Sequence, residues 1–383
     1  MFVIRPAVID DLATLLKLAK MVHFINLPAD KDIISAKIAR SRRSFAGQAK
    51  DAKDRQFMFV LEDTETGNVV GTSAVMCCIS WPGWPHVFLK VRRREYYSQD
   101  LQQGSVHTTI EFGTDESGPS ELGGLILAPG YRGHGQKLGS LLSLVRLHYV
   151  GIHRDLFKDR MLAELMGPLT PDSRTMLWEY LGRRFINLSY SEADLFCQHS
   201  KEFITSLWPR GEIHTSILPP EARALIGKVG EETLAARAML ERQGFRFNGH
   251  VDPFDGGPYL EAETDKVPLV RETELLRLGG TSERHKRVGI VSCQPKDGTF
   301  RAVRAAYSLE DGRLWIPGDA AKAIGAREGD RVGLTPLGKV ERAPDREGER
   351  GRSAGRADDG EREDGRSGAR RKGGRRKARA GKA

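Results

Sequence analysis

Residues 125–139 read Leu-Ile-Leu-Ala-Pro-Gly-Tyr-Arg-Gly-His-Gly-Gln-Lys-Leu-Gly, and this stretch decides the fold. An apolar strand, residues 121–127, runs into a glycine-rich basic loop that opens a helix. Glycines let the backbone approach a phosphate closely, and the first N–H groups of a helix favour negative charge. The loop lacks the Gly-Lys-Ser/Thr ending of a P-loop and the G-x-G-x-x-G spacing of a dinucleotide fold. By itself, the segment predicts a phosphate-binding loop of no particular class.

The flanking sequence alternates strand-like and helix-like segments. Upstream, an apolar strand at Phe2–Ile4 precedes a helix capped by Asp10 or Asp11. A helix at 30–45 follows, and then a hairpin with strands at 56–61 and 69–76. Downstream we expect a helix at 138–150, a strand at 160–166, a helix at 173–182, a strand at 185–188, a helix at 231–243 and a strand from 244. This mixture predicts an α/β or α+β fold.

The sequence after residue 278 has a different pattern. Short β segments and one helical stretch alternate with turns, at residues 287–293, 300–307, 314–316, 319–324 (helical) and 329–334. They predict a small β domain at 285–340 behind a linker at 279–285. We therefore expect domain boundaries near residues 200, 278 and 340.

The last segment, residues 341–383, is strongly charged. It holds 15 Lys/Arg and 9 Asp/Glu and no aromatic residue, so it carries +6 of the formal net charge of +9. Such a segment buries too little apolar surface to offset the entropy of ordering it, and we expect a disordered basic tail. The remaining net charge of +3 belongs to residues 1–340, and so small a charge argues against a nucleic-acid-binding core. We favour the interpretation that the tail is a solubilising or merely tolerated extension. The alternative is that its basic residues contact RNA.

Cysteine spacing and the N-terminus bear on the compartment. The four cysteines, Cys77, Cys78, Cys197 and Cys293, have no metal-type spacing and make a poor disulfide framework, so reduced thiols fit best. The N-terminus does not read as a signal peptide, and no apolar run approaches the ~18–20 residues of a membrane span. We therefore expect a soluble cytoplasmic protein without a metal site.

The order of these elements resembles the GNAT superfamily of acyl-CoA-dependent N-acyltransferases. The resemblance is carried by the strand Ile4-Arg5-Pro6-Ala7, the hairpin end Val69–Ala74, the loop Tyr131–Gly135 and the segment Leu177–Gly182. Further matches are similar to the arginine N-succinyltransferases: Ser120-Glu121-Leu122, Gly182-Arg183-Arg184-Phe185, Ser191–Phe196 and Phe254–Pro258. The likeness covers roughly residues 1–275, and residues 285–340 also resemble the C-terminal part of that family.

The resemblance implies an α/β (α+β) acyl-CoA N-acyltransferase (GNAT-like) fold with a small C-terminal β domain. Residues 1–200 would bind acyl-CoA, and residues 201–278 would form a second GNAT-like or family-specific substrate region. Succinyl-CoA would be the co-substrate, held by the central strand and its loop through Leu125, Leu127, Arg132, Gly133, Gly135, Lys137 and Gly139. Backbone N–H groups near Leu125 would stabilise the developing oxyanion.

The implied reaction transfers the succinyl group to the α-amino group of L-arginine, sometimes of ornithine, in arginine catabolism. The family also implies a homo-oligomer or a heteromer with a related subunit. Two other functions stay open: an N-acyltransferase with a different amine acceptor or acyl-CoA, and a CoA-binding non-catalytic subunit of a heteromeric succinyltransferase. A fourth and weaker hypothesis is that the tail binds nucleic acid.

Two positions depart from the family pattern. The histidine that donates a proton in the family follows an Ile-Gly-x-Val segment, whereas here Gly230 follows Ile226-Gly227-Lys228-Val229. Lys137 stands where a small residue is usual, two places after Gly135, and the loop is a couple of residues longer, with Gly139 as the substitute.

Several residues are candidates for the missing proton chemistry. Among Glu231, Glu232, His214 and His250 we single out His250 and Glu231, although Glu231 and Glu232 also suit a helix cap and His250 a structural role. His134 suits phosphate or solvent contact. Glu121 could receive the guanidinium or amine of the substrate, because a buried strand carboxylate needs a partner. Asp255 either holds a turn or binds substrate.

Overall fold

The computed structural model describes residues 1–21, 27–172, 174–294 and 299–339, which belong to one compact unit, residues 1–340. Its strands are β1 (Phe2–Pro6), β2 (Gln56–Asp63), β3 (Val69–Met76), β4 (His86–Ser98), β5 (Gln103–Asp115), β6 (Ser120–Leu127), β7 (Arg160–Glu164), β8 (Glu212–His214), β9 (Arg246–Val251), β10 (Pro258–Glu263), β11 (Glu274–Thr281), β12 (Arg287–Cys293), β13 (Arg301–Glu310), β14 (Arg313–Ile316) and β15 (Arg331–Lys339). Its helices are α1 (Leu12–Met21), α2 (Lys31–Phe45), α3 (Leu138–Ile152), α4 (Met176–Tyr180), α5 (Tyr190–Cys197), α6 (Glu202–Leu207), α7 (Pro220–Arg223), α8 (Leu234–Arg242), α9 (Pro268–Arg271) and α10 (Gly318–Ile324).

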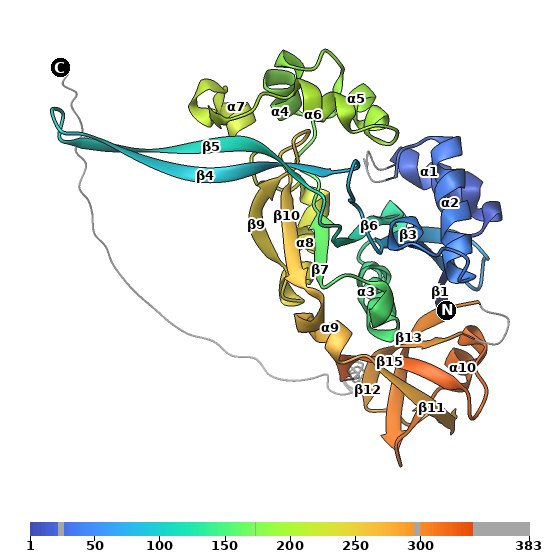
Figure 1. Cartoon of the computed structure of the whole chain (residues 1–383). Coiled ribbons are helices and arrows are strands. Elements are labelled where there is room, and N and C mark those ends of the chain that lie inside the picture. Colours follow the sequence, from blue (N-terminus) through green and yellow to red (C-terminus); the bar gives the residue numbers. More distant parts are fainter. Residues whose placement is uncertain (22–26, 173, 295–298, 340–383) are drawn as a thin grey trace, which may run out of the picture. The chain divides into compact units, whose positions relative to one another are not determined.

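The described strands join into one sheet. Their order is β12-β15-β11-β14-β13-β1-β2-β3-β6-β7-β10-β9-β4-β5-β8. Strands β1, β2, β3 and β6 in the middle of this sheet lie between α3 and the pair α1/α2 (Figure 1). It is the α/β arrangement that the resemblance to GNAT acyltransferases predicts.

Alternation along β2 explains why both faces of the central sheet are covered. Phe57 and Phe59 pack in the core that contains α3, whereas Met58 and Val60 pack in the core that contains α1 and α2. Successive strand side chains point to opposite faces, so a strand that is apolar throughout must be buried on both. At the start of α2, the Asp30 carboxylate accepts hydrogen bonds from two backbone N–H groups and caps the helix.

Strands β6 and β7 diverge soon after they pair. They run parallel, and their register covers only Ser120 with Met161 and Glu121 with Leu162. On the other side of β6, two residues, Gly124 and Leu125, oppose one residue of β3, which is a β-bulge, and Gly124 has φ of +58°. The divergence leaves a wedge-shaped gap beside the strand that leads into the glycine-rich loop.

A long hairpin and a group of short helices form the next part of the fold. Strands β4 and β5 make a hairpin that extends beyond the neighbouring strands (Figure 1). Its base packs on helices α4 to α7 through an apolar cluster that contains Trp178 and Trp208. The sequence did not lead us to expect this hairpin.

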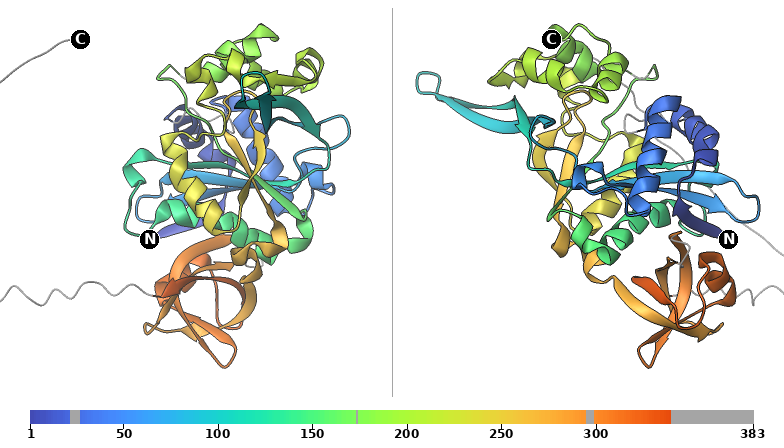
Figure 2. Two further views of the ribbon diagram at one scale, coloured as in Figure 1. Left: turned by 90° about the vertical axis from the view of Figure 1, so that its left-hand side faces the viewer. Right: turned by 45° about the vertical axis from the view of Figure 1, so that its right-hand side comes forward.

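The C-terminal strands β11 to β15 enclose an apolar cluster of their own together with α10. Figure 2 shows them gathered at one end of the unit, where β15 contacts α3. Strand β13 joins them to the central sheet through one pair of residues, Ile4 and Ala302. The domain boundaries that the sequence suggests inside residues 1–340 stay predictions, and the expected disordered tail, 341–383, lies outside the described residues.

Two local expectations are wrong. Residues 185–188 form no strand: they are turn and irregular backbone that leads to Ser189, which caps α5. The expected linker at 279–285 begins inside β11, which runs to Thr281. Among the described residues, no helix is long and apolar enough to cross a membrane.

Candidate functional site

The wedge between β6 and β7 contains a cavity. It has a volume of about 780 Å³. Its walls are backbone and apolar side chains of the two diverging strands and of α8, and its wide end is formed by the glycine-rich loop and the start of α3. We call it the loop cavity; the residues that matter below are Gly123, Leu125, Arg132, Lys137, Arg146 and Glu232.

The loop ends with a backbone conformation that few side chains adopt. Lys137 is the N-terminal cap of α3 with φ of +55°, and Gly133 has φ of +73°. Residues 132–137 are exposed, so their N–H groups and cations stand at the mouth of the cavity. The Arg132 guanidinium forms an ion pair with Glu232, at 3.4 Å between Nη1 and Oε1. A helix N-terminus with cations beside it is suited to bind a pyrophosphate.

The second cavity, of about 410 Å³, is lined by charged side chains. We call it the carboxylate cavity. Its acidic residues are Glu121, Glu164, Asp194 and Asp252, and its basic residues are Lys37, Arg40, Lys53, Arg55 and Lys201. Trp81 and Trp84 also line it, with their rings stacked at 5.9 Å between centroids.

Burial perturbs the carboxyl groups of this cavity. It raises the pKa of Glu121 to about 7, against the attraction of Lys37 and Lys201. It raises the pKa of Asp194 likewise to about 7, with repulsion from Asp252 adding to the shift. The pKa of Glu164 is well above its usual range through burial, helped by repulsion from Glu121 and Asp252. A cluster of buried carboxyl groups favours a cationic ligand, because the positive charge would offset the electrostatic repulsion between the carboxylates.

The two cavities meet at the bulge of β6. Gly124 of β6 and Glu164 of β7 line both of them, as does Leu27. Because β7 ends at Glu164, its carboxyl lies where the wedge opens into the carboxylate cavity. A molecule in one cavity can therefore touch a molecule in the other beside Glu164.

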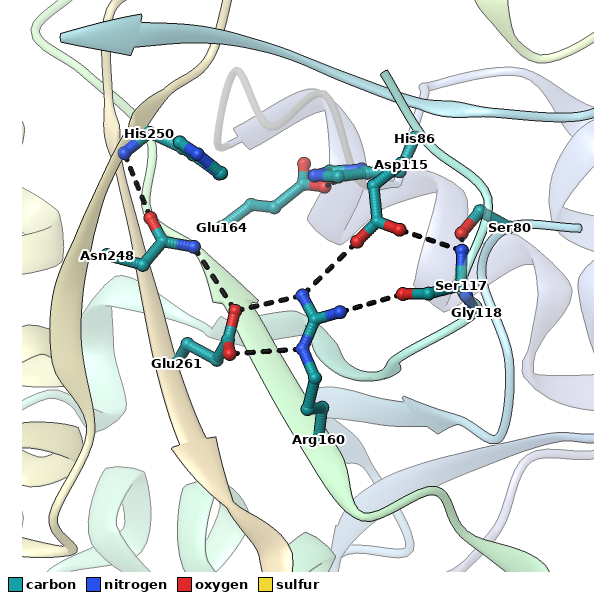
Figure 3. A network of polar contacts seen from close by, with 10 residues as sticks. All are labelled: Ser80, His86, Asp115, Ser117, Gly118, Arg160, Glu164, Asn248, His250 and Glu261. Atoms are coloured by element: carbon teal, nitrogen blue, oxygen red, sulfur yellow. Dashed lines mark hydrogen bonds and ion pairs between the residues drawn. The ribbon is translucent and has the colours of Figure 1, made fainter. Parts of the chain in front are cut away.

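His86 lies next to this junction. Its Nδ1 is 3.3 Å from Oε1 of Glu164, and Figure 3 shows the carboxyl group directed at the imidazole ring. Burial lowers the pKa of His86 to about 3, so its ring is neutral at physiological pH. Its Nε2 is buried and has no hydrogen-bond partner among the described residues. A neutral imidazole beside a carboxyl group can hold that group in one orientation.

The predicted binding residues on the central strand and loop come together. Leu125, Leu127, Arg132, Gly133, Gly135, Lys137 and Gly139 all line the loop cavity. Glu121 lines the carboxylate cavity instead, with 6% of its surface exposed. His134 also lines the loop cavity, where its ring lies edge-on to Phe2.

Three other predicted site residues line neither cavity. The ring of His250 stacks on Phe88 at 3.8 Å, beside a network of polar contacts around Arg160 (Figure 3). Glu231 is exposed in the first turn of a 3-10 helix, Glu231–Thr233. Asp255 accepts a hydrogen bond from Gly257 N–H at 2.7 Å and so holds a turn. Catalytic or binding roles for these three stay predictions.

Gly230, where the family has a histidine, also lines neither cavity. Its N–H donates to Met166 O at 3.0 Å and its backbone caps the same 3-10 helix. Our reading of the sequence did not single out His86, Glu164 or Asp252. The available signals were an acid that closes an apolar strand, for Glu164, and a position just before the Phe254–Pro258 match, for Asp252. In the part of the chain that the structure describes, no group of three or more His, Cys, Asp or Glu could hold a metal ion.

Known proteins resemble this chain over most of its length. The family described as arginine N-succinyltransferase beta subunit matches residues 2–269. An arginine N-succinyltransferase of Shigella boydii serotype 4 (strain Sb227) is 33% identical over 346 residues, which are 89% of this chain and 99% of that protein. One from Escherichia coli (strain 55989 / EAEC) is 33% identical over 341 residues, 88% of this chain and 98% of that protein.

A solved structure extends the likeness to the fold. The arginine/ornithine succinyltransferase subunit AI from Pseudomonas aeruginosa has a TM-score of 0.75 with this chain at 26% identity, over 88% of this chain and 99% of that one. The residues that line both cavities all lie within residues 2–269, the stretch that the family matches. The chain therefore belongs to the arginine N-succinyltransferase family of acyl-CoA-dependent N-acyltransferases.

Proposed function

We propose that this protein transfers the succinyl group of succinyl-CoA to the α-amino group of L-arginine. One observation carries the proposal: a cavity with a helix N-terminus and basic side chains at its mouth meets a cavity rich in buried acids at Gly124 and Glu164. An acyl-CoA in the loop cavity would present its thioester to an amine in the carboxylate cavity. The names of the relatives supply the acyl group and the acceptor.

The charges of the carboxylate cavity suit arginine as the acceptor. Arginine brings two cationic groups, the guanidinium and the α-ammonium, and a guanidinium pairs best with a carboxylate. Glu121 and Asp194 are available for these contacts, while Lys37 or Lys201 can receive the carboxylate of the amino acid. Trp81 and Trp84 add aromatic surface on which a planar guanidinium can stack.

The loop cavity suits the CoA part of the donor. Arg132, Lys137 and the first turn of α3 would bind the pyrophosphate. The edge of β6 that faces the wedge would bind the amide-containing arm, and N–H groups near Leu125 would polarise the thioester carbonyl.

Glu164 is the group best positioned to take the proton of the acceptor. A free α-amino group is mostly protonated at neutral pH and must lose a proton before it attacks. In our proposal Glu164 takes that proton, and the nitrogen forms a bond to the thioester carbonyl carbon. The C–S bond breaks, and the second proton that the nitrogen loses ends on the CoA thiolate. His86 positions the Glu164 carboxyl.

Other residues expected to be catalytic have smaller parts in this proposal. Glu121 is retained as a contact of the cationic acceptor rather than as the base. His250 and Glu231 are given no step, because neither lines a cavity. Asp252 replaces Asp255 as the acid near the substrate, since only Asp252 lines the carboxylate cavity.

The direct test uses the purified full chain. It is incubated with succinyl-CoA and L-arginine, thiol release is followed against a control without arginine, and the product is identified by mass. Arginine-dependent release with succinylarginine as the product supports the proposal. Release with ornithine or another amine alone, or with another acyl-CoA alone, would contradict the assigned substrates. No thiol release from succinyl-CoA or from another acyl-CoA, with any amine acceptor, would mean that the chain needs a second subunit.

Assembly belongs to the same proposal. The solved relative is itself named as a subunit, subunit AI. We propose that this chain assembles either with copies of itself or with a related subunit. Light scattering of the active protein distinguishes the two: an active homo-oligomer excludes the need for a partner, and an inactive monomer that a related subunit activates excludes the homo-oligomer.

A further inference from the structure

Arg146 is a buried cation in the wall of the loop cavity. It belongs to the middle of α3, and only 3% of its surface is exposed. None of the steps above uses it. Arginine is almost never fully buried without a partner, because taking a charge out of water is costly.

Helix α3 runs back along β6, and this fixes the end of the wedge at which Arg146 lies. At the start of the helix, a Cβ on Gly139 would be 3.6 Å from the Leu127 side chain. Two turns later, Arg146 donates from Nη1 to Gly123 O at 3.2 Å. Leu127 is at the wide end of the wedge and Gly123 is near the narrow end, where β6 and β7 still pair. Arg146 is therefore about 12 Å along the helix from the phosphate-binding turn.

The described hydrogen bonds of Arg146 go to neutral groups. Besides Gly123 O, they go from Nε to Ser143 O at 2.9 Å and from Nη2 to Ser143 Oγ at 2.9 Å. A guanidinium has five N–H donors, so these bonds leave two unused. Burial lowers the pKa of Arg146 to about 10, and Glu121 opposes this shift from a distance without an ion pair among the described residues.

The donor would place its acyl group at this end of the wedge. If the pyrophosphate binds at the wide end, the arm that carries the thioester follows β6 toward Gly124, where the acceptor cavity joins. The part of the acyl group beyond the carbonyl then points into the narrow end. There it meets a buried cation with unused donors in a water-poor wall.

We propose that Arg146 binds a carboxylate at the far end of the acyl group, so that the loop cavity selects dicarboxylic acyl-CoA donors over plain aliphatic ones. This inference rests on the proposed function and adds the residue that would read the donor. A carboxylate would accept the unused N–H donors and provide the missing counterion. Arg146 is then a specificity-determining residue rather than only a brace between α3 and β6.

The experiment compares two donors of equal acyl chain length, succinyl-CoA and butyryl-CoA, which differ in the terminal carboxylate. Binding of each donor and of free CoA is measured by calorimetry for the wild type, Arg146→Gln and Arg146→Lys. We expect Arg146→Gln to weaken succinyl-CoA binding about 10- to 100-fold, the size expected for a lost charged hydrogen bond. Butyryl-CoA and free CoA should bind as in the wild type. Arg146→Lys should retain part of the preference, because it keeps the charge without the fork of donors.

The matched control is Arg160→Gln, which removes an arginine that lines neither cavity and pairs with Asp115 and Glu261. It should leave the ratio of the two donor affinities unchanged. Equal losses for succinyl-CoA, butyryl-CoA and CoA in Arg146→Gln would show a structural role only and overturn the inference. Because binding needs no acceptor, that result is distinct from a failure of the proposed reaction, which appears as succinyl-CoA bound but never transferred to arginine.

Discussion

His148 of helix α3 lies 2.6 Å from the hydroxyl of Thr335, measured from Nδ1 to Oγ1, and so joins the core around the loop cavity to strand β15. Its Nε2 is 2.7 Å from Ser292 Oγ on β12. The ring is fully buried, and burial lowers its pKa to about 3. The same helix therefore presents Leu138 to the loop, Arg146 to the wedge and His148 to the C-terminal strands.

The buried His148 should make the protein sensitive to mild acid. Its folded pKa of about 3 lies below the ordinary value of 6.5, so the unfolded chain binds a proton first. The contribution of the neutral ring to stability is complete above pH 6.5 and is lost as the pH falls toward 3, by about 1.4 kcal/mol per pH unit. His148→Gln should be less stable than the wild type at pH 7.5, but its unfolding free energy should fall less steeply between pH 6.5 and 5. Denaturant titrations at several pH values measure this, and equal slopes would refute it.

Replacing Glu164 should remove catalysis without unfolding the protein. Burial raises the pKa of Glu164, and glutamine keeps the shape of the side chain while it removes the group that takes the proton. We expect Glu164→Gln to lower kcat about 10²- to 10⁴-fold with unchanged melting temperature. Wild-type activity should rise with pH as Glu164 loses its proton, and the variant should lose that step.

The control for Glu164 is Glu263→Gln. Glu263 is exposed at the end of β10, pairs with Lys266 and lines neither cavity, so the wild-type rate and pH profile are expected. A Glu164→Gln enzyme with the wild-type pH profile would exclude Glu164 as the base.

Arg132 and Glu232 should have opposite effects on the acyl-CoA donor. Both line the loop cavity, and their ion pair of 3.4 Å is half exposed. Arg132→Ala should raise the KM for succinyl-CoA about 3- to 10-fold, a loss of roughly 1 kcal/mol for one phosphate contact. Glu232→Gln frees the guanidinium and should lower that KM. The KM for arginine should not change in either variant, and the difference between the variants should shrink at high salt.

Asp252 and Asp255 should separate substrate binding from turn stability. Asp252 lines the carboxylate cavity, and its Oδ1 also accepts from Phe254 N–H at 2.7 Å and Asp255 N–H at 3.0 Å. Asparagine keeps an oxygen for these two backbone contacts, so Asp252→Asn should raise the KM for arginine several-fold without opening the turn. Asp255 is 2% exposed and accepts from Gly257 N–H, so Asp255→Ala should instead cost about 1–3 kcal/mol of unfolding free energy. Steady-state kinetics and thermal melts of both variants check this. A raised KM for arginine in Asp255→Ala with an unchanged melt would restore Asp255 as a substrate contact.

Local elements could be predicted well where periodicity and capping agree. The expected strands at 69–76 and 287–293 have the bounds of β3 and β12, and the helix expected at 30–45 is α2 with Asp30 as its cap. The predicted strand at 185–188 is wrong because a short apolar run has the same sequence pattern in a strand and in a buried turn. Here Ile186 packs in the cluster of Trp178, and a 3-10 turn at Gly182–Arg184 sets its direction.

The two cavities differ in how far the sequence predicts them. Half of the lining of the loop cavity comes from one stretch, residues 122–140, so the residues chosen from the motif around Arg132 line it together. The carboxylate cavity draws its acids from β6, β7, α5 and the segment before β10. No spacing in the sequence links those residues.

By itself, the sequence determined the strand, loop and helix on which the predicted phosphate site is built, because these depend on neighbouring residues: glycines in the loop and an apolar stripe along α3. Only the tertiary structure decided that Glu164 lies between the two cavities and that Arg146 faces the wedge. Both depend on the point at which β6 and β7 stop pairing. That point is set by the packing of long-range neighbours on each strand, which a linear pattern does not contain.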